Sequence, residues 1–133
     1  MCYLLDKARK DYNVVKELYR INDEMYLDIC CYHIQQAIEK ILKCSIELKG
    51  SRYEFTHNIA RLYQDFIACG WEEIRDLQLM AGTLTDWEAG SRYKESFFAT
   101  TADLQTAMEL YQTLEEKIQQ YLEDLETEEG DNK

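Results

Sequence analysis

The chain of 133 residues contains no proline and only five glycines. These two residues interrupt regular backbone structure most strongly, so their scarcity favours long uninterrupted elements. No run of apolar residues approaches the ~18 to 20 that a membrane span needs. Residues 1–6 also meet charge too early to serve as a secretory signal. We therefore expect a soluble cytoplasmic protein that makes no contact with a membrane.

The five cysteines include no Cys-x-x-Cys pair. Without paired spacing, neither a zinc site nor a disulfide framework is expected. Free cysteine is among the residues most often buried, so we expect reduced thiols in the core, as in a reducing cytoplasm. The five are Cys2, Cys30, Cys31, Cys44 and Cys69.

Motifs for cofactors and common catalytic centres are missing. There is no glycine-rich phosphate loop, nucleophile elbow or Ser/Cys–His–Asp set. Glu54-x-x-His57 has the spacing of half a di-iron site, but such a site needs a second Glu-x-x-His. The only other histidine is His33. We expect neither a metal nor a cofactor.

The net charge of −11 is unevenly distributed. Residues 1–62 hold ten Lys/Arg and nine Asp/Glu, whereas residues 63–133 hold five and seventeen. A nucleic-acid binder should be basic, because phosphate contacts dominate such affinity. RNA or a nucleotide would therefore bind a local patch on the N-terminal half. The acidic half fits either a basic protein partner or a plain solvated face.

Apolar spacing predicts five helices and no strands, which is an all-α helical bundle. Asn22-Asp23 should end the first helix and cap the second, Gly50 should cap the end of the second, and Gly90 should end the fourth. Thr101 should cap the last. The second helix is apolar on two sides, which indicates a central position. The predicted ranges are 4–21, 24–49, 57–69, 71–88 and 101–125.

These helices make one domain over residues 1–125, of four main helices and a shorter one. Residues 126–133 are acidic and are expected to be a disordered tail. Residues 91–100 form a polar-aromatic linker, in which Phe97 and Phe98 should pack against the bundle.

The segment Cys31-Tyr-His-Ile-Gln-Gln-Ala-Ile-Glu-Lys-Ile-Leu-Lys43 combines a helical apolar pattern with a polar cluster. His33, Gln36 and Lys40 share one helix face. They could offer donors to a nucleotide. Alternatively they form a buried polar ladder that fixes helix register.

This segment resembles the signature helix of the HEPN family, small helical domains associated with nucleotides and RNA. Residues 56–62, Thr-His-Asn-Ile-Ala-Arg-Leu, and residues 89–93, Ala-Gly-Ser-Arg-Tyr, follow in the family's order. The resemblance covers about residues 5–122. It implies an antiparallel up-and-down bundle, usually a two-fold dimer with a groove near the seam. Many members are encoded beside a minimal nucleotidyltransferase in a toxin–antitoxin-like pair.

Active HEPN ribonucleases share an arginine, four to six residues and then a histidine. The matching arginine here is Arg92, but positions 97 to 99 are Phe-Phe-Ala and no histidine follows His57. Neither a phenyl ring nor a methyl group can transfer a proton. Arg92 and Tyr93 could still bind a phosphate, or Arg92 could pair with a carboxylate while Tyr93 packs at a dimer seam.

The resemblance therefore implies a non-catalytic HEPN protein that dimerises, binds a nucleotidyltransferase partner and takes a nucleotide. An RNA-cleaving toxin using His33 with Arg92, or a purely structural homodimerisation module, are the alternatives. Ten tyrosines exceed what a small core buries easily, which leaves several for an interface.

Overall fold

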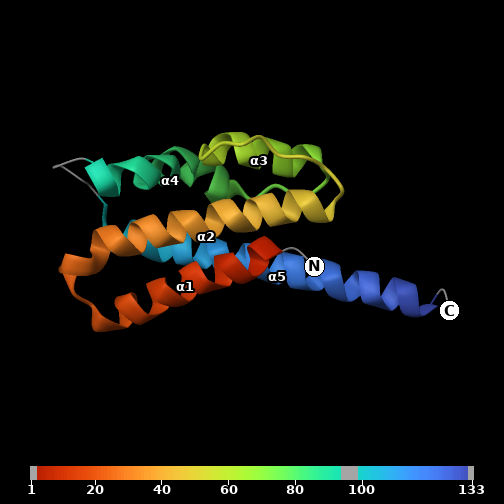
Figure 1. The fold of residues 1–133 in the computed structure, drawn as a ribbon, viewed down its shortest axis with the longest axis horizontal. Coiled ribbons are helices and arrows are strands. Elements are labelled where there is room, and N and C mark those ends of the chain that lie inside the picture. The colour runs from red at the N-terminus through yellow and green to blue at the C-terminus, as the bar shows by residue number, and fades with distance from the viewer. Residues whose placement is uncertain (1–2, 94–98, 132–133) are drawn as a thin grey trace.

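The computed structural model describes residues 3–93 and 99–131, and for residues 89–93 and 129–131 it describes the backbone alone. Helices are the only regular secondary structure among these residues, so the predicted all-α class is confirmed for this part of the chain. The elements are α1 (Tyr3–Ile21), the short 3₁₀ helix η1 (Glu24–Tyr26), α2 (Leu27–Leu48), α3 (Ile59–Ala68), α4 (Arg75–Tyr93) and α5 (Thr101–Asp131) (Figure 1).

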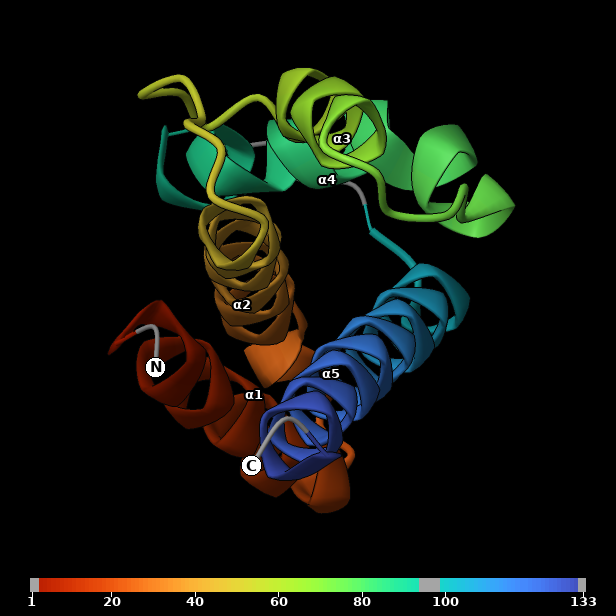
Figure 2. The ribbon, with the colours of Figure 1, turned by 90° about the vertical axis from the view of Figure 1, so that its right-hand side faces the viewer.

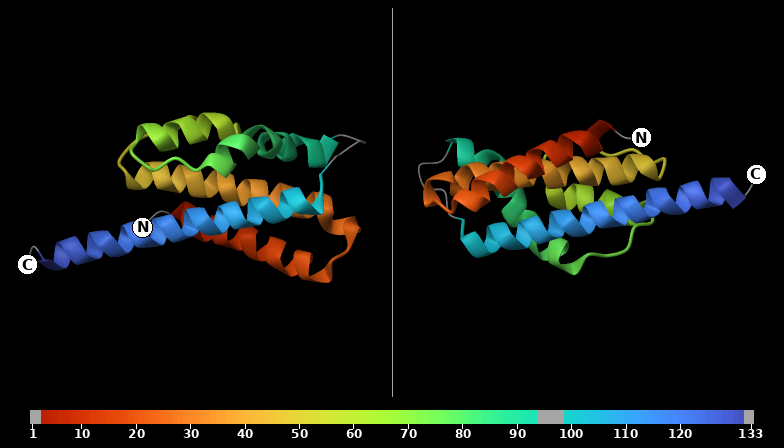
Figure 3. Two further views of the ribbon diagram at one scale, coloured as in Figure 1. Left: turned by 180° about the vertical axis from the view of Figure 1, so that it is seen from behind. Right: turned by 90° about the horizontal axis from the view of Figure 1, so that it is seen from below.

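Helix α2 lies at the centre of the molecule. α1 runs back along it as an antiparallel neighbour, and α3 and α4 together form a layer over one side (Figures 1 and 2). α5 packs against α2 from another side, and its C-terminal end extends past the other helices (Figure 3). None of the helices in the described part of the chain is apolar and long enough to span a membrane.

The central position of α2 follows from its sequence and was predicted from it. Apolar residues occupy two sides of the helix, and twelve of its 22 residues are buried. Ile29 is an exception among the apolar residues of the helix, since it lies 41% exposed near the start. The buried residues are Cys30, Cys31, Ile34, Gln35, Ala37, Ile38, Glu39, Ile41, Leu42, Cys44, Ser45 and Ile46.

The predicted stops at Asn22 and Gly50 form as expected, but the predicted cap Asp23 serves the 3₁₀ helix η1, and α2 itself begins after Tyr26 without a side-chain cap. Asn22 has a φ of 55°, which a helix cannot continue, and the Asp23 side chain accepts a hydrogen bond from the Met25 amide. Gly50 ends α2 with a φ of 76°, in the left-handed region that favours glycine. Asn58 then caps α3 by accepting a hydrogen bond from the Arg61 amide.

Four helix ends differ from the prediction. η1 occupies residues 24–26, so α2 begins at Leu27, and α4 begins at Arg75 because Trp71 is drawn into contacts with α2. Gly90 does not end α4, which continues to Tyr93. The cap of α5 is Thr100, whose hydroxyl accepts from the Asp103 amide, not Thr101.

The acidic C-terminal segment also differs from the expected disordered tail, because α5 continues to Asp131. Its last turns gain local hydrogen bonds from Gln120 to Asp124 and from Thr127 to the Glu123 carbonyl. Gly130 is the first glycine after residue 100, so nothing earlier interrupts the helix. The predicted packing of Phe97 and Phe98 lies outside the described residues.

The chain between α3 and α4 is fixed by an aromatic cluster. The Trp71 indole donates to the Ser45 carbonyl at 2.9 Å and stacks on Phe66 with ring centroids 5.6 Å apart. The Lys49 ammonium lies 4.7 Å from the ring centroids of both Trp71 and Tyr121. Trp71 therefore ties α2, α3 and α5 together at one end of the bundle.

The described cysteines are reduced, and three of the four are buried, as predicted. Burial raises the pKa of the Cys31 thiol to about 12, and the pKa of Cys30 is raised for the same reason. Cys69 is half-buried, and its thiol donates to the Phe66 carbonyl. The core thiols behave as small apolar side chains.

Candidate functional site

The polar residues of α2 divide between two neighbouring helices. On the side facing α1, both His33 and Lys40 contact the Asp11 carboxylate. The Asp11 carboxylate lies 3.0 Å from His33 Nδ1 through one oxygen, and its other oxygen accepts from Lys40 Nζ. The three side chains are each less than a third exposed. This cluster links α1 to α2 through the Lys40–Asp11 ion pair and the His33–Asp11 contact, and the part played by Asp11 was not anticipated from sequence.

Gln36 belongs to a different group of contacts, although it shares a helix face with His33 and Lys40. Its amide donates to Gln35 Oε1 at 2.7 Å, and the Gln35 amide donates to Glu39 Oε1 at 3.3 Å. Gln35 is fully buried and Glu39 is only 4% exposed. The three predicted α2 residues are therefore not brought together as one ligand set.

The Glu39 carboxylate makes most of the contacts in this second group. Its Oε1 lies 2.7 Å from Nδ1 of His57, which precedes α3, and its Oε2 lies 3.4 Å from Lys43 Nζ. The contact between His57 and Glu39 is not local, because the two residues are 18 positions apart in the chain. A buried carboxylate needs such partners, because desolvation without them is expensive. The group links α2 to the segment that enters α3.

The remaining predicted site residues, Arg92 and Tyr93, are the last two residues of α4. Their side chains, and the interpretations attached to them, lie outside what is described. Glu54, the other member of the Glu-x-x-His spacing, pairs with Arg61 Nη2 at 3.1 Å and is separate from the His57–Glu39 contact. Among the described residues no group of three metal-ligating side chains converges.

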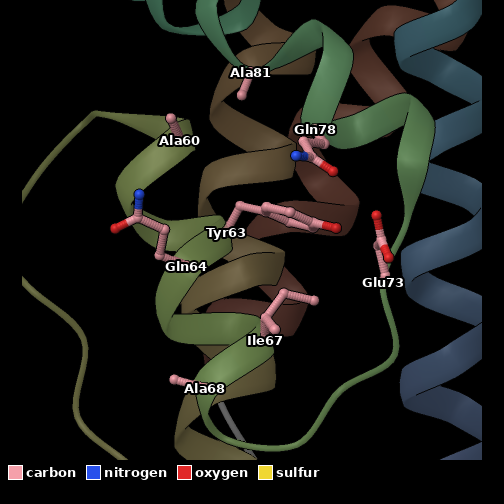
Figure 4. Close-up of a pocket in the computed structure, with 8 residues that line it drawn as sticks. All are labelled: Ala60, Tyr63, Gln64, Ile67, Ala68, Glu73, Gln78 and Ala81. Atoms are coloured by element: carbon pink, nitrogen blue, oxygen red, sulfur yellow. The ribbon is translucent and has the colours of Figure 1, made fainter.

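A cavity of about 510 Å³ lies between α3 and α4. Figure 4 shows the Tyr63 ring extending from α3 toward Gln78 and Glu73, with Ala81 on the far wall. The Tyr63 hydroxyl accepts a hydrogen bond from the Ile74 amide. Glu73 is the one ionised group in the lining, and its negative charge would repel a phosphate.

Negative charge is concentrated on α5. The acidic side chains from residue 123 to residue 128 are all exposed, on the end of the helix that extends past the bundle (Figure 3). Ile21, Met25 and Ile29 are also exposed, at 58%, 71% and 41%, around the turn from α1 to α2. The surface therefore offers an acidic end and a separate apolar patch.

These features define a class of protein: a small helical bundle whose two histidines each contact a carboxylate and whose surface charge is uneven. A family model described as the HEPN domain matches residues 1–125. The chain belongs to the HEPN domain family. No curated protein and no solved structure matches it.

Proposed function

We propose that this HEPN protein is non-catalytic, forms a dimer and binds a minimal nucleotidyltransferase as its partner. The non-catalytic assignment is supported by the contacts of the two histidines. His33 is held by Asp11 and His57 by Glu39, and no histidine follows Arg92. Arg92 thus lacks the proton-transfer group with which the ribonucleases of the family pair their arginine.

The surface supports the proposed partners. A dimer would cover the exposed apolar side chains at the α1–α2 turn, since large apolar side chains exposed near one another often mark an interface. The acidic end of α5 would meet a basic surface of the nucleotidyltransferase, because complementary charge favours association. A domain over residues 1–125 would then form the dimer, and the acidic segment after it would bind the nucleotidyltransferase.

A nucleotide ligand is part of the proposal. His33 and Lys40 are 29% and 25% exposed, so each retains hydrogen-bonding capacity outside its contact with Asp11. Gln36 contacts Gln35 and is set apart from this pair, so the proposed ligand residues are His33 and Lys40, with Gln36, Arg92 and Tyr93 as the further candidates from the sequence. A nucleotide phosphate at this face would compete with Asp11 for its contacts with His33 and Lys40.

Purified protein incubated with total RNA is expected to leave the RNA intact, because no histidine accompanies Arg92. The measurement is gel analysis of the RNA beside the His33→Ala and Arg92→Ala variants. All three proteins should give the same pattern as buffer alone. Cleavage by the wild-type chain that disappears in both variants would identify an RNA-cleaving toxin and overturn the non-catalytic assignment.

Affinity purification of the tagged chain from its native cells, followed by mass spectrometry, tests the partner. A stoichiometric nucleotidyltransferase is expected. Light scattering during size-exclusion chromatography gives the oligomeric state of the same sample. A monomer that recovers no nucleotidyltransferase would contradict both parts of the proposal.

A further inference from the structure

The cavity between α3 and α4 has room for a small molecule. Its volume of about 510 Å³ lies within the range of ~300–1,000 Å³ that is usual for ligand pockets. Three of the eight lining residues are alanines, whose short side chains leave the space open: Ala60, Ala68 and Ala81. The lining shares no residue with the face of α2 that is proposed to take a nucleotide, so the cavity is a separate feature.

One wall of the cavity is apolar and is supplied by α3. The Tyr63 ring and the Ile67 side chain project from this helix into the space (Figure 4). The ring is held in place, because its hydroxyl accepts from the Ile74 amide at 3.0 Å and it stacks on Phe66 with centroids 6.1 Å apart. Ile67 is 37% exposed, although it is a large apolar side chain. The apolar part of a ligand could pack against this wall.

Glu73 stands on the side that the Tyr63 ring points toward (Figure 4). Its carboxylate is exposed and forms no ion pair within the described chain, whereas the neighbouring Glu72 pairs with Lys117 at 3.8 Å. Glu73 is therefore a free negative charge at the edge of an apolar hollow.

The lining is suited to a positively charged group. It carries one negative charge, that of Glu73, and no positive one. The ring of Tyr63 adds to the attraction, because the face of an aromatic ring attracts cations. The side-chain carbonyl oxygens of Gln64 and Gln78 are further acceptors at the cavity.

We propose that this cavity binds a small organic cation, a protonated amine carried on an apolar ring or chain. The apolar part packs against Tyr63 and Ile67, and the ammonium group donates to the Glu73 carboxylate. A charge-assisted hydrogen bond of this kind is stronger than one between neutral groups, so Glu73 selects amines over neutral molecules of the same shape. The site is independent of the proposed dimer and of the nucleotidyltransferase partner.

A titration of the whole chain followed by ¹H–¹⁵N NMR spectroscopy tests the proposal. The probe is 2-phenylethylammonium chloride, compared at equal ionic strength with 2-phenylethanol, which lacks the charge, and with 3-phenylpropanoate, which reverses it. The amine is expected to shift the amide resonances of α3 and of residues 73–81 until they saturate. It should bind about tenfold more tightly than the alcohol, since one charge-assisted contact is added to the same apolar body.

Glu73→Gln is the diagnostic variant, and Glu72→Gln is its matched control. Both remove one exposed carboxylate, so they change the net charge of the chain equally. Only Glu73 lines the cavity. Glu73→Gln should weaken binding of the amine about tenfold and leave binding of the alcohol unchanged, and Glu72→Gln should change neither. Glu73→Lys should reverse the preference, so that 3-phenylpropanoate binds more tightly than the amine.

Ala60→Leu tests the cavity itself, because the larger side chain occupies part of the space at an exposed position of α3. It should weaken binding of the amine and of the alcohol by the same factor. The proposal would be overturned by equal affinity for the three probes, by equal losses in Glu72→Gln and Glu73→Gln, or by unchanged affinity in Ala60→Leu. None of these results bears on recovery of the nucleotidyltransferase partner.

Discussion

Replacement of Glu39 by alanine is expected to lower the free energy of unfolding by about 2–4 kcal/mol. The change removes the acceptor shared by Gln35, Lys43 and His57. Gln35 is fully buried and Lys43 is 14% exposed, so neither can recover the lost contact from bulk water. Urea unfolding followed by far-UV circular dichroism gives the difference.

The control for this prediction is Glu17→Ala. Glu17 pairs with Arg20 on α1, and both side chains are more than two-thirds exposed. An exposed pair of this kind contributes about 0.5 kcal/mol or less. If Glu39→Ala were no more destabilising than Glu17→Ala, the Glu39 group would not hold α2 to the start of α3, and a ligand-binding role would become the better interpretation of its polar residues.

Replacement of Trp71 by alanine is expected to cost about 3 kcal/mol, near the lower end for an aromatic truncation because the ring is only partly buried. The variant loses the stack on Phe66, the contact with Tyr121 and the hydrogen bond to the Ser45 carbonyl. The same urea titration measures the loss. Its effect should appear as a lower midpoint with an unchanged slope.

Trp71→Phe separates the contribution of ring stacking from that of the indole hydrogen bond. It keeps a ring for stacking and for Lys49 but removes the indole N–H, so it should cost about 1 kcal/mol, the usual worth of one hydrogen bond. Equal losses for the two variants would show that the hydrogen bond to Ser45 alone fixes this end of the bundle. A negligible loss for both would mean that α3 and α4 are held by other contacts.

The fold could be predicted from sequence because its signals are local. The two-sided apolar pattern of α2 identified the central helix, and Asn22, Asp23 and Gly50 marked turns through their own conformational preferences. The start of α4 could not be found this way. Residues 71–74 have an acceptable helical pattern, but the contacts of Trp71 with distant residues hold them out of the helix.

The candidate site was only partly predictable for a related reason. Helical spacing places His33, Gln36 and Lys40 on one face of their own helix, but it does not say which helix packs there. Asp11 lies 22 residues before His33 and contacts both His33 and Lys40, while Gln36 donates to Gln35.

The reactivity of the buried thiols can be used to measure unfolding of the bundle. Alkylating reagents attack the thiolate, and the raised pKa of Cys31 leaves almost none of it at neutral pH. Cys30, Cys31 and Cys44 are buried in the core, so they become reactive only when the bundle opens. In a chain with Cys2 and Cys69 replaced by serine, the rate of alkylation would follow the opening of α2 from its neighbours, with no label or mutation inside the core.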